Sequence, residues 1–229
     1  MTRIRGIDIS HWQGIIDFDK VKASGIDFVI MKAGGEEKGF YTDRNFEHNY
    51  KAAIAAGLHV GAYYFIGKSF IGDSAGIDAA HRLQKIIKGK KFDYPVFVDI
   101  ETTDKQKKHL ATRAAVAFCE EMEKAGYFVG IYASDISGFK ERLNLEDLKP
   151  YTLWVAKYGE RALAQPTYVK DWHIWQYTSK GKVPGISGSV DLDESKTDYA
   201  KIIAEKGFNG YTKKRTKKEE NKCLQTQIF

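Results

Sequence analysis

Short apolar stretches alternate with longer amphipathic stretches along most of the chain. Runs rich in Val, Ile, Tyr and Phe predict strands, and the helical periodicity between them predicts helices. The predicted strands are residues 3–10, 27–33, 58–65, 94–101, 128–134, 151–158, 172–178 and 189–193. The predicted helices are residues 17–25, 43–57, 74–89, 111–126 and 193–207.

This alternation favours parallel βαβ units, because parallel neighbours need a crossover that is usually a helix. Eight strands with fewer than eight helices predict an α/β fold, a single irregular TIM-like (β/α) barrel. A doubly wound open sheet is the alternative, although no Gly-rich phosphate-binding fingerprint follows the first strand. We expect residues 1–210 to form this one barrel domain and residues 211–229 to form a basic, disordered tail.

The formal net charge of +6 is unevenly distributed. Residues 212–229 contain six Lys or Arg and two Glu, so the body is nearly neutral, with 30 basic and 28 acidic residues. A nearly neutral body argues against nucleic-acid binding, and the tail is either a solvated end or a contact to an anionic surface. No apolar run reaches the roughly 18 residues of a membrane span, and residues 1–10 lack the features of a signal peptide.

Acidic side chains gather where predicted strands end. In the segment VFVDIE, Asp99 and Glu101 share one face of the strand because side chains alternate. Asp8 lies near the end of the first strand and Asp191 near the end of the last. First and last strands are neighbours in a closed barrel, so these four acids are expected to converge at the mouth where such barrels place their chemistry.

Clustered carboxyl groups raise one another's pKa values, which leaves a protonated acid beside an ionised one, as glycoside hydrolysis requires. Helix capping or ion pairing is the alternative for each single acid, and an Mg²⁺ or Ca²⁺ site is the alternative for the cluster. The two cysteines, Cys119 and Cys223, indicate neither a disulfide framework nor metal ligands. We expect no metal and no other cofactor, and His11 is a candidate to line the cleft.

Five motifs, in order, resemble those of glycoside hydrolase family 25, the Chalaropsis-type lysozymes found among bacterial muramidases and phage endolysins. They are RGIDISHWQG, GAYYF, PVFVDIE, WVAKY and IWQYTSKGKVPGISGSVDLD. The resemblance runs over nearly all of residues 3–210. It implies an irregular (β/α) catalytic barrel that hydrolyses the β-1,4 bond between N-acetylmuramic acid and N-acetylglucosamine in peptidoglycan, with retention of configuration.

The resemblance also implies roles for individual residues. Glu101 is the implied general acid/base and Asp99 its partner, while Asp8 and Asp191 complete the acidic floor. The implied substrate-binding residues are Tyr63, Lys32, Tyr132, Trp154, Trp175 and Gln176. Core packing is the alternative role for these residues, above all for the two tryptophans.

Two positions depart from the family pattern. Gly35 stands where a Glu is expected, so either Glu36 or Glu37 replaces it or the role is lost. Tyr64 stands where a His is expected. Both changes are expected to affect substrate binding more than the acid pair.

Two routes are open for the attack on the sugar, one by a protein carboxylate and one by the substrate's own 2-acetamido oxygen. The adjacent Asp99 and Glu101 favour the second route. A chitinase-type or other N-acetylhexosaminidase and a non-catalytic wall-binding module are the alternative functions.

The expected partner is the glycan strand of peptidoglycan, without nucleic acid or membrane insertion, and the chain is expected to be a monomer. We expect it to act on the bacterial cell wall, after release through a phage holin or after secretion with its leader removed.

Overall fold

The strands form one sheet that closes on itself in this computed structural model, which describes residues 3–159 and 165–213. The sheet order is β1-β9-β8-β7-β6-β5-β4-β2-β3, and β1 also pairs with β2. The strands are β1 (Ile4–Ile9), β2 (Phe28–Gly35), β3 (Tyr41–Thr42), β4 (His59–Phe65), β5 (Val96–Asp99), β6 (Val129–Ser134), β7 (Thr152–Ala156), β8 (Ile174–Gly181) and β9 (Val190–Ser195). The short β3 only extends the edge of β2, so eight strands make the barrel. Residues 214–229, most of the predicted tail, lie outside the described residues.

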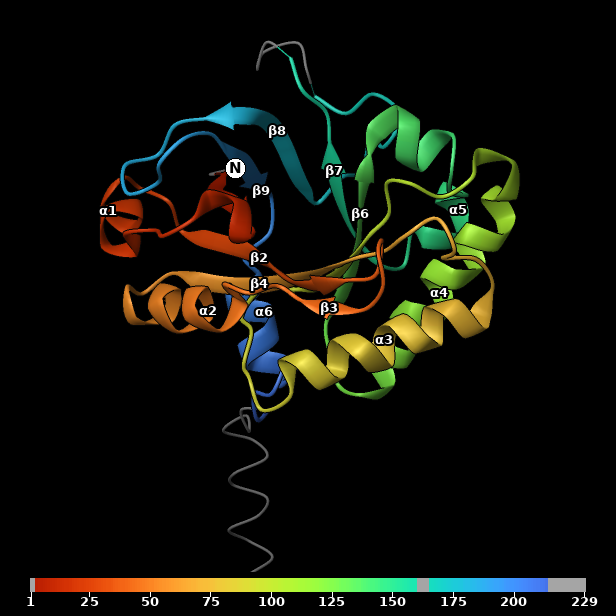
Figure 1. The fold of residues 1–229 in the computed structure, drawn as a ribbon, viewed down its shortest axis with the longest axis horizontal. Coiled ribbons are helices and arrows are strands. Elements are labelled where there is room, and N and C mark those ends of the chain that lie inside the picture. Colours follow the sequence, from red (N-terminus) through yellow and green to blue (C-terminus); the bar gives the residue numbers. More distant parts are fainter. Residues whose placement is uncertain (1–2, 160–164, 214–229) are drawn as a thin grey trace, which may run out of the picture.

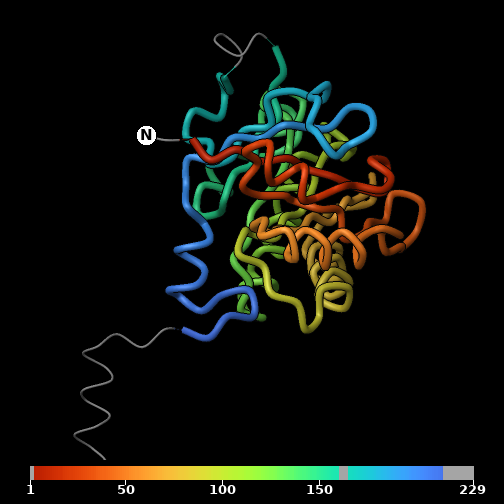
Figure 2. Tube along the Cα trace, turned by 90° about the vertical axis from the view of Figure 1, so that its left-hand side faces the viewer, coloured from red at the N-terminus to blue at the C-terminus, as the bar shows by residue number. Residues whose placement is uncertain are grey.

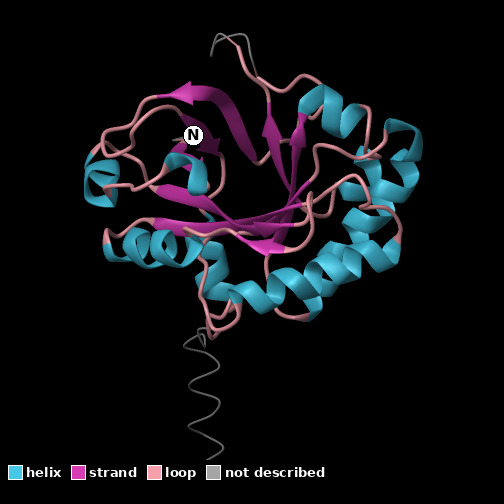
Figure 3. Ribbon diagram, viewed as in Figure 1, coloured by secondary structure: helices cyan, strands magenta, loops and turns pink. Residues whose placement is uncertain are grey.

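The helices cover only part of the barrel. The α-helices of the described residues are α1 (Phe18–Ala23), α2 (Phe46–Ala55), α3 (Asp73–Ile87), α4 (Lys108–Lys124), α5 (Leu145–Leu148) and α6 (Tyr199–Lys206). Shorter helical segments are η1 (His11–Gln13), η2 (Lys105–Lys107) and η3 (Asp135–Lys140). No α-helix connects β8 to β9, at the upper left of Figure 1, whereas α2, α3 and α4 lie below and to the right of the strands (Figure 3). The prediction of a TIM-like barrel with fewer than eight helices is therefore confirmed.

The last barrel strand runs against its neighbours. β9 pairs antiparallel with both β1 and β8, while the other neighbouring barrel strands pair parallel. Figure 2 shows the first strand, in red, beside the blue C-terminal part of the chain. The expectation of parallel units does not hold here, because a hairpin rather than a crossover helix joins β8 to β9. The predicted helix at residues 193–207 also begins too early, since β9 continues to Ser195 and α6 starts at Tyr199.

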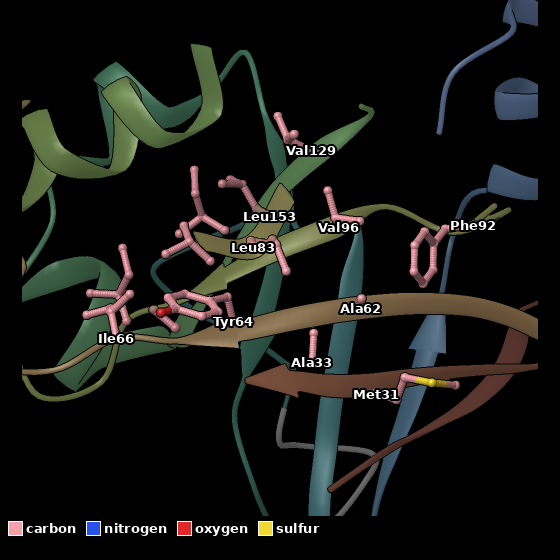
Figure 4. Close-up of a cluster of buried hydrophobic side chains, with 14 of the residues drawn as sticks. Met31, Ala33, Ala62, Tyr64, Ile66, Leu83, Phe92, Val96, Val129 and Leu153 are labelled. Carbon is pink, nitrogen blue, oxygen red and sulfur yellow. The ribbon is translucent and has the colours of Figure 1, made fainter. Parts of the chain in front are cut away.

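Alternation along the strands creates two apolar layers. Side chains such as Met31, Ala62 and Val96 belong to the layer between the barrel and its helices (Figure 4). The second layer fills the lumen and comprises Phe28, Ile30, Tyr94, Phe97, Tyr132, Trp154, Ala156, Ile174, Tyr199 and Ile203. The lumen is therefore a packed core and not a channel, and its polar residues gather at one mouth.

The opposite end of the lumen is closed by α6. Tyr199 and Ile203 from this helix are buried against the lumen core. Tyr94 stacks on Phe28 with ring centroids 4.3 Å apart and meets the edge of Tyr199 at 5.5 Å. Such aromatic pairs add to the free energy gained by burying their apolar area.

Asn209 holds the segment that follows α6 against the barrel. Its side-chain amide donates to the Tyr94 carbonyl at 2.9 Å, and its side-chain oxygen accepts from the Phe128 backbone N–H at 2.7 Å. The residue is fully buried and adopts a left-handed φ of 53°, which Asn tolerates better than most residues. One side chain thus satisfies backbone groups from two segments of the barrel base.

We predict that Asn209→Ala lowers the free energy of unfolding by about 3 kcal/mol, because two buried backbone groups lose their partners. Urea unfolding followed by circular dichroism measures this change. Asn45→Ala is the matched control, since its amide makes one exposed bond to the Gly14 carbonyl. Equal unfolding midpoints for the two variants would contradict the stabilising role of the two Asn209 side-chain hydrogen bonds.

Candidate active site

A cleft of ≈ 250 Å³ opens at the carboxyl ends of the parallel strands. It is lined by Asp8, Ile9, Ser10, Trp12, Gln13, Lys32, Tyr63, Phe65, Asp99, Glu101, Tyr132, Trp154, Tyr158, Gln176 and Asp191. A larger hollow of ≈ 590 Å³ lies over α3 and α4, but its acidic residues are exposed and Asp73 pairs with Arg113. The smaller cleft is therefore the candidate site, because buried acids are the groups whose proton affinity is altered.

Strand register brings the predicted acids together. Asp8 lies opposite Asp191 in the β1–β9 pair, and Asp99 ends β5 beside Tyr132 of β6. Asp191 reaches the mouth because it lies near the start of an antiparallel strand, not near the end of a parallel one. Glu101 lies two residues beyond Asp99, outside the strand, and its residue is exposed. All four predicted acids therefore line one cleft.

Asp99 and Glu101 form one pair of acids in the cleft. Burial raises the pKa of Asp99 well above its usual range, and the neighbouring Glu101 carboxyl group raises it further. Burial also raises the pKa of Glu101, although Lys32, the neighbouring Asp99 and Arg142 all lower it. Joint ionisation of the two carboxyl groups is therefore disfavoured, and the neutral form is favoured more strongly at the more deeply buried Asp99.

A second group of acids lies beside this pair. Burial raises the pKa of Asp8, and the neighbouring Asp193 and Asp191 raise it further. Burial raises the pKa of Asp193 to about 8, although the Trp154 indole N–H, which donates to it at 2.7 Å, lowers it. Burial raises the pKa of Asp191 to about 6, with a contribution from Glu101. These groups cannot all be ionised together at neutral pH.

Sequence reasoning did not include Asp193 among the site residues. The alternation of β9 places it on the same face as Asp191, so this signal was available. Asp193 contacts Trp154 and Asp8, which both line the cleft. Asp193 itself is fully buried beneath the cleft surface.

Gln176 joins the two sides of the cleft. Its amide nitrogen donates to Asp8 at 2.6 Å, and its amide oxygen accepts from Tyr132 at 2.8 Å and from Tyr158 at 2.6 Å. Two hydroxyl donors on one side and a carboxyl group on the other fix which way the amide points. Tyr158 was missed by sequence reasoning, although it follows Trp154 and Ala156 at the spacing of a shared strand face.

The predicted aromatic residues divide between the two faces of the barrel. Trp154 is 1% exposed and packs in the lumen, with its ring centroid 4.5 Å from that of Tyr132 and 6.0 Å from that of Tyr63. The structure does not bring Trp175 to the cleft. Because Gln176 faces the lumen, Trp175 faces outward, where its indole N–H donates to the Lys157 carbonyl at 2.9 Å.

The segment after β2 contains the two candidates for the missing Glu. Glu36 pairs with Arg82 at 2.6 Å and accepts from the Tyr64 hydroxyl at 3.3 Å. Glu37 lies nearer the cleft, 3.8 Å from the ammonium nitrogen of Lys32. Tyr64 itself belongs to the outer apolar layer, so its departure from the family pattern does not touch the cleft wall.

The rim of the cleft carries an exposed aromatic side chain. Trp12 is 80% exposed and lies on η1, which a capping box between Ser10 and Gln13 holds in place. His11 does not line the cleft, because its Nδ1 lies 2.7 Å from a carboxylate oxygen of the buried Asp43. Trp12 was also missed by sequence reasoning, although it lies within the motif RGIDISHWQG.

The described part of the chain contains no group of three or more His, Cys, Asp and Glu side chains placed to hold a metal ion. Over the same residues, no helix is both long enough and apolar enough to span a membrane.

Comparison with known proteins identifies the family to which the chain belongs. A sequence profile described as "Glycosyl hydrolases family 25" matches residues 7–186. The autolytic lysozyme of Clostridium acetobutylicum is 32% identical over 191 residues, which cover 83% of this chain and 55% of that protein. The chain thus spans little more than half the length of this relative.

Solved structures are similar over most of the chain. The CTP1L endolysin superposes with a TM-score of 0.74 at 29% identity, covering 87% of this chain and 69% of that one. The modular autolysin LytC from Streptococcus pneumoniae, in complex with a synthetic peptidoglycan ligand, superposes with a TM-score of 0.71 at 25% identity. That match covers 84% of this chain and 46% of LytC.

We predict that Asp193→Asn removes part of the pH dependence of folding stability. The pKa of Asp193 is raised from 3.8 to about 8, so its stabilising contribution is fully present below pH 3.8 and is lost as pH rises through about 8. The variant should be more stable than wild type at pH 9, where the buried carboxyl group of wild type must ionise, and nearly equal to it at pH 4.

Guanidinium unfolding midpoints at the two pH values measure this effect. Asp147→Asn, on the exposed surface of α5, is the matched control. A stability difference between wild type and Asp193→Asn that does not change with pH would contradict the raised pKa.

Proposed function

The chain belongs to glycosyl hydrolases family 25, and from this premise we propose that it is a lysozyme, an N-acetylmuramidase. Its proposed reaction is hydrolysis of the β-1,4 bond between N-acetylmuramic acid and N-acetylglucosamine in bacterial peptidoglycan. The observation that carries the proposal is the Asp99–Glu101 pair at the mouth of the barrel, where both residues line the cleft and burial raises the pKa of both carboxyl groups. The similarity to an autolytic lysozyme, to an endolysin and to an autolysin crystallised with a peptidoglycan ligand supports this substrate.

Glu101 is the proposed proton donor. Its residue is exposed and lines the cleft, so it can reach the oxygen of a bound glycosidic bond. A sugar over the cleft removes water from Glu101 and disfavours its charged form, which draws a proton from Asp99 to Glu101. Glu101 then passes this proton to the leaving oxygen as the bond to the sugar C1 breaks.

Asp99 is proposed to act through the 2-acetamido group of the substrate. The acetamido oxygen attacks C1, which forms a cyclic oxazolinium ion, and ionised Asp99 stabilises its positive charge. Water then attacks C1, loses a proton to Glu101 and reopens the ring, so two inversions give retention of configuration. The burial of Asp99, which is only 4% exposed, favours this route over direct attack by its carboxylate.

The rest of the cleft is proposed to bind the glycan. Trp12 and Tyr158 present exposed aromatic surface at the rim, and aromatic rings provide apolar faces on which sugars stack. Lys32, Tyr63 and Gln176 are the proposed polar contacts deeper in the cleft. We propose that the protein acts on the bacterial cell wall as a monomer.

We predict that Glu101→Gln lowers the rate of peptidoglycan hydrolysis by about 10²- to 10⁴-fold, because the amide cannot deliver a proton. Purified peptidoglycan is digested, the products are reduced with borohydride, and the new sugar ends are identified. Muramitol ends from the wild type establish the muramidase reaction.

Glu146→Gln on the exposed surface of α5 is the matched control and should digest like wild type. Glucosaminitol ends would overturn the assignment of the bond. Binding to walls without any new ends would favour a non-catalytic binding module.

We predict that the rate depends on the basicity of the substrate's acetamido oxygen. Replacing N-acetyl by N-trifluoroacetyl in a short synthetic glycan should lower kcat/KM by more than about tenfold, because the transition state needs this oxygen as its nucleophile. Asp99→Asn should lower the rate on the N-acetyl substrate, since a neutral amide stabilises the oxazolinium charge less well. Equal kcat/KM for the two substrates would favour direct attack by a carboxylate.

A further inference from the structure

Lys32 is the only Lys or Arg among the described residues that line the cleft. It belongs to the lumen-facing side of β2 and is 8% exposed. Its ammonium lies 4.4 Å from the ring centroid of Phe65 and 5.4 Å from that of Tyr41, distances at which cation–π attraction acts. A single buried cation beside several acids strongly influences where their protons reside.

Glu37 approaches this lysine by folding back over Gly35. A Cβ atom at position 35 would lie 2.8 Å from a carboxylate oxygen of Glu37 and 2.7 Å from the Tyr41 hydroxyl. The missing side chain of Gly35 thus leaves the space that the Glu37 carboxylate occupies. Tyr41 donates to the two carboxylate oxygens at 2.8 and 3.0 Å, and one of them lies 3.8 Å from the Lys32 ammonium.

The neighbouring glutamate has a different environment. Glu36 is bound by Arg82 at 2.6 Å and by Tyr64, whose ring is fully buried in the outer apolar layer. Its side chain is 10% exposed, against 31% for Glu37. The two adjacent glutamates therefore contact residues on different faces of the barrel wall. Of the two, only Glu37 contacts a residue of the cleft.

The charged and titratable groups around Lys32 come from several elements. Asp99 and Glu101 face it from the end of β5, Glu37 from the segment after β2, Tyr41 from β3, and Tyr63 from β4. Lys32 lowers the pKa of both acids, and Glu37 raises that of Asp99. Arg142 is a further cation that lowers the pKa of Glu101. Glu37 and Lys32 therefore act on the pKa of Asp99 with opposite signs.

We propose that Glu37 is a positioning residue, which holds the Lys32 ammonium against Phe65 and Tyr41 and partly offsets its charge at the Asp99–Glu101 pair. Its effect is to set the pH range over which the pair carries a transferable proton. The inference rests on the proposed function for its catalytic meaning, whereas the placement of Glu37 beside Lys32 is independent of the substrate.

The first experiment follows the side-chain carboxyl ¹³C signal of Glu101 as a function of pH. Its resonance is assigned by its disappearance in Glu101→Gln. In Glu37→Gln the midpoint should fall by on the order of half a pH unit, because removing a negative charge beside Lys32 favours ionisation of the acids. Glu36→Gln is the matched control. It removes the same charge from the adjacent residue, whose carboxylate pairs with Arg82 and not with Lys32.

Coincident titration curves for wild type and Glu37→Gln would overturn the proposal. A Glu36→Gln shift as large as that of Glu37→Gln would also overturn it, because a nonspecific change in net charge would then suffice. Glu37→Asp, which keeps the charge on a shorter side chain, should restore most of the wild-type midpoint.

A second experiment tests whether Glu37 acts through Lys32. In a Lys32→Met background, Glu37→Gln should shift the Glu101 midpoint clearly less than in wild type, because only the direct effect of the Glu37 charge remains. A shift of the same size as in wild type would refute the positioning role. With peptidoglycan as substrate, the alkaline limb of the wild-type pH–rate profile should move to lower pH in Glu37→Gln. If the wild type released no sugar ends at any pH, the proposed function would fail while the titrations still decided the role of Glu37.

Discussion

The antiparallel insertion of β9 between β1 and β8 is the constraint on which the site depends. This pairing closes the barrel, and it places Asp191 opposite Asp8 and Asp193 opposite Gln176. A parallel strand at this position would put the same sequence at the other end of the lumen, because its first residues would then lie at the base. The acidic mouth is therefore a consequence of strand direction as much as of residue identity.

Gathering acids in a packed lumen carries an energetic cost that the surrounding contacts limit. An unpaired buried carboxylate is strongly disfavoured, so these groups hold protons or accept directed hydrogen bonds. The Trp154 indole donates to Asp193 and the Gln176 amide donates to Asp8, and both donor residues line the cleft. The same burial that lowers stability at high pH keeps a proton available near neutral pH, so one physical cause links stability to the proposed chemistry.

Much of the fold and part of the site could be predicted from sequence periodicity. Alternating strands and helices identified the barrel, period-two alternation placed Asp99 in the lumen, and the motif resemblance placed Gln176 in the cleft. The same alternation, applied to β8, excludes Trp175 from the cleft and, applied beyond β7, includes Tyr158. Those two outcomes were within reach of the sequence, whereas the motif resemblance alone assigned Trp175 to the cleft and did not assign Tyr158.

The direction of β9 and the roles of Glu36 and Glu37 were not within reach, because both depend on contacts between distant segments. Strand periodicity is the same for parallel and antiparallel pairing, so it does not reveal how β9 runs. The two glutamates differ only in their partners. Glu36 pairs with Arg82 on α3, whereas Glu37 contacts Tyr41 and Lys32. Gly35 favours the second arrangement, since a Cβ atom there would lie only 2.8 Å from a Glu37 carboxylate oxygen and 2.8 Å from the Phe65 carbonyl oxygen. A glycine that looks like the loss of a functional residue in the sequence thus provides, in the folded chain, the space through which a neighbouring carboxylate reaches the cleft lysine.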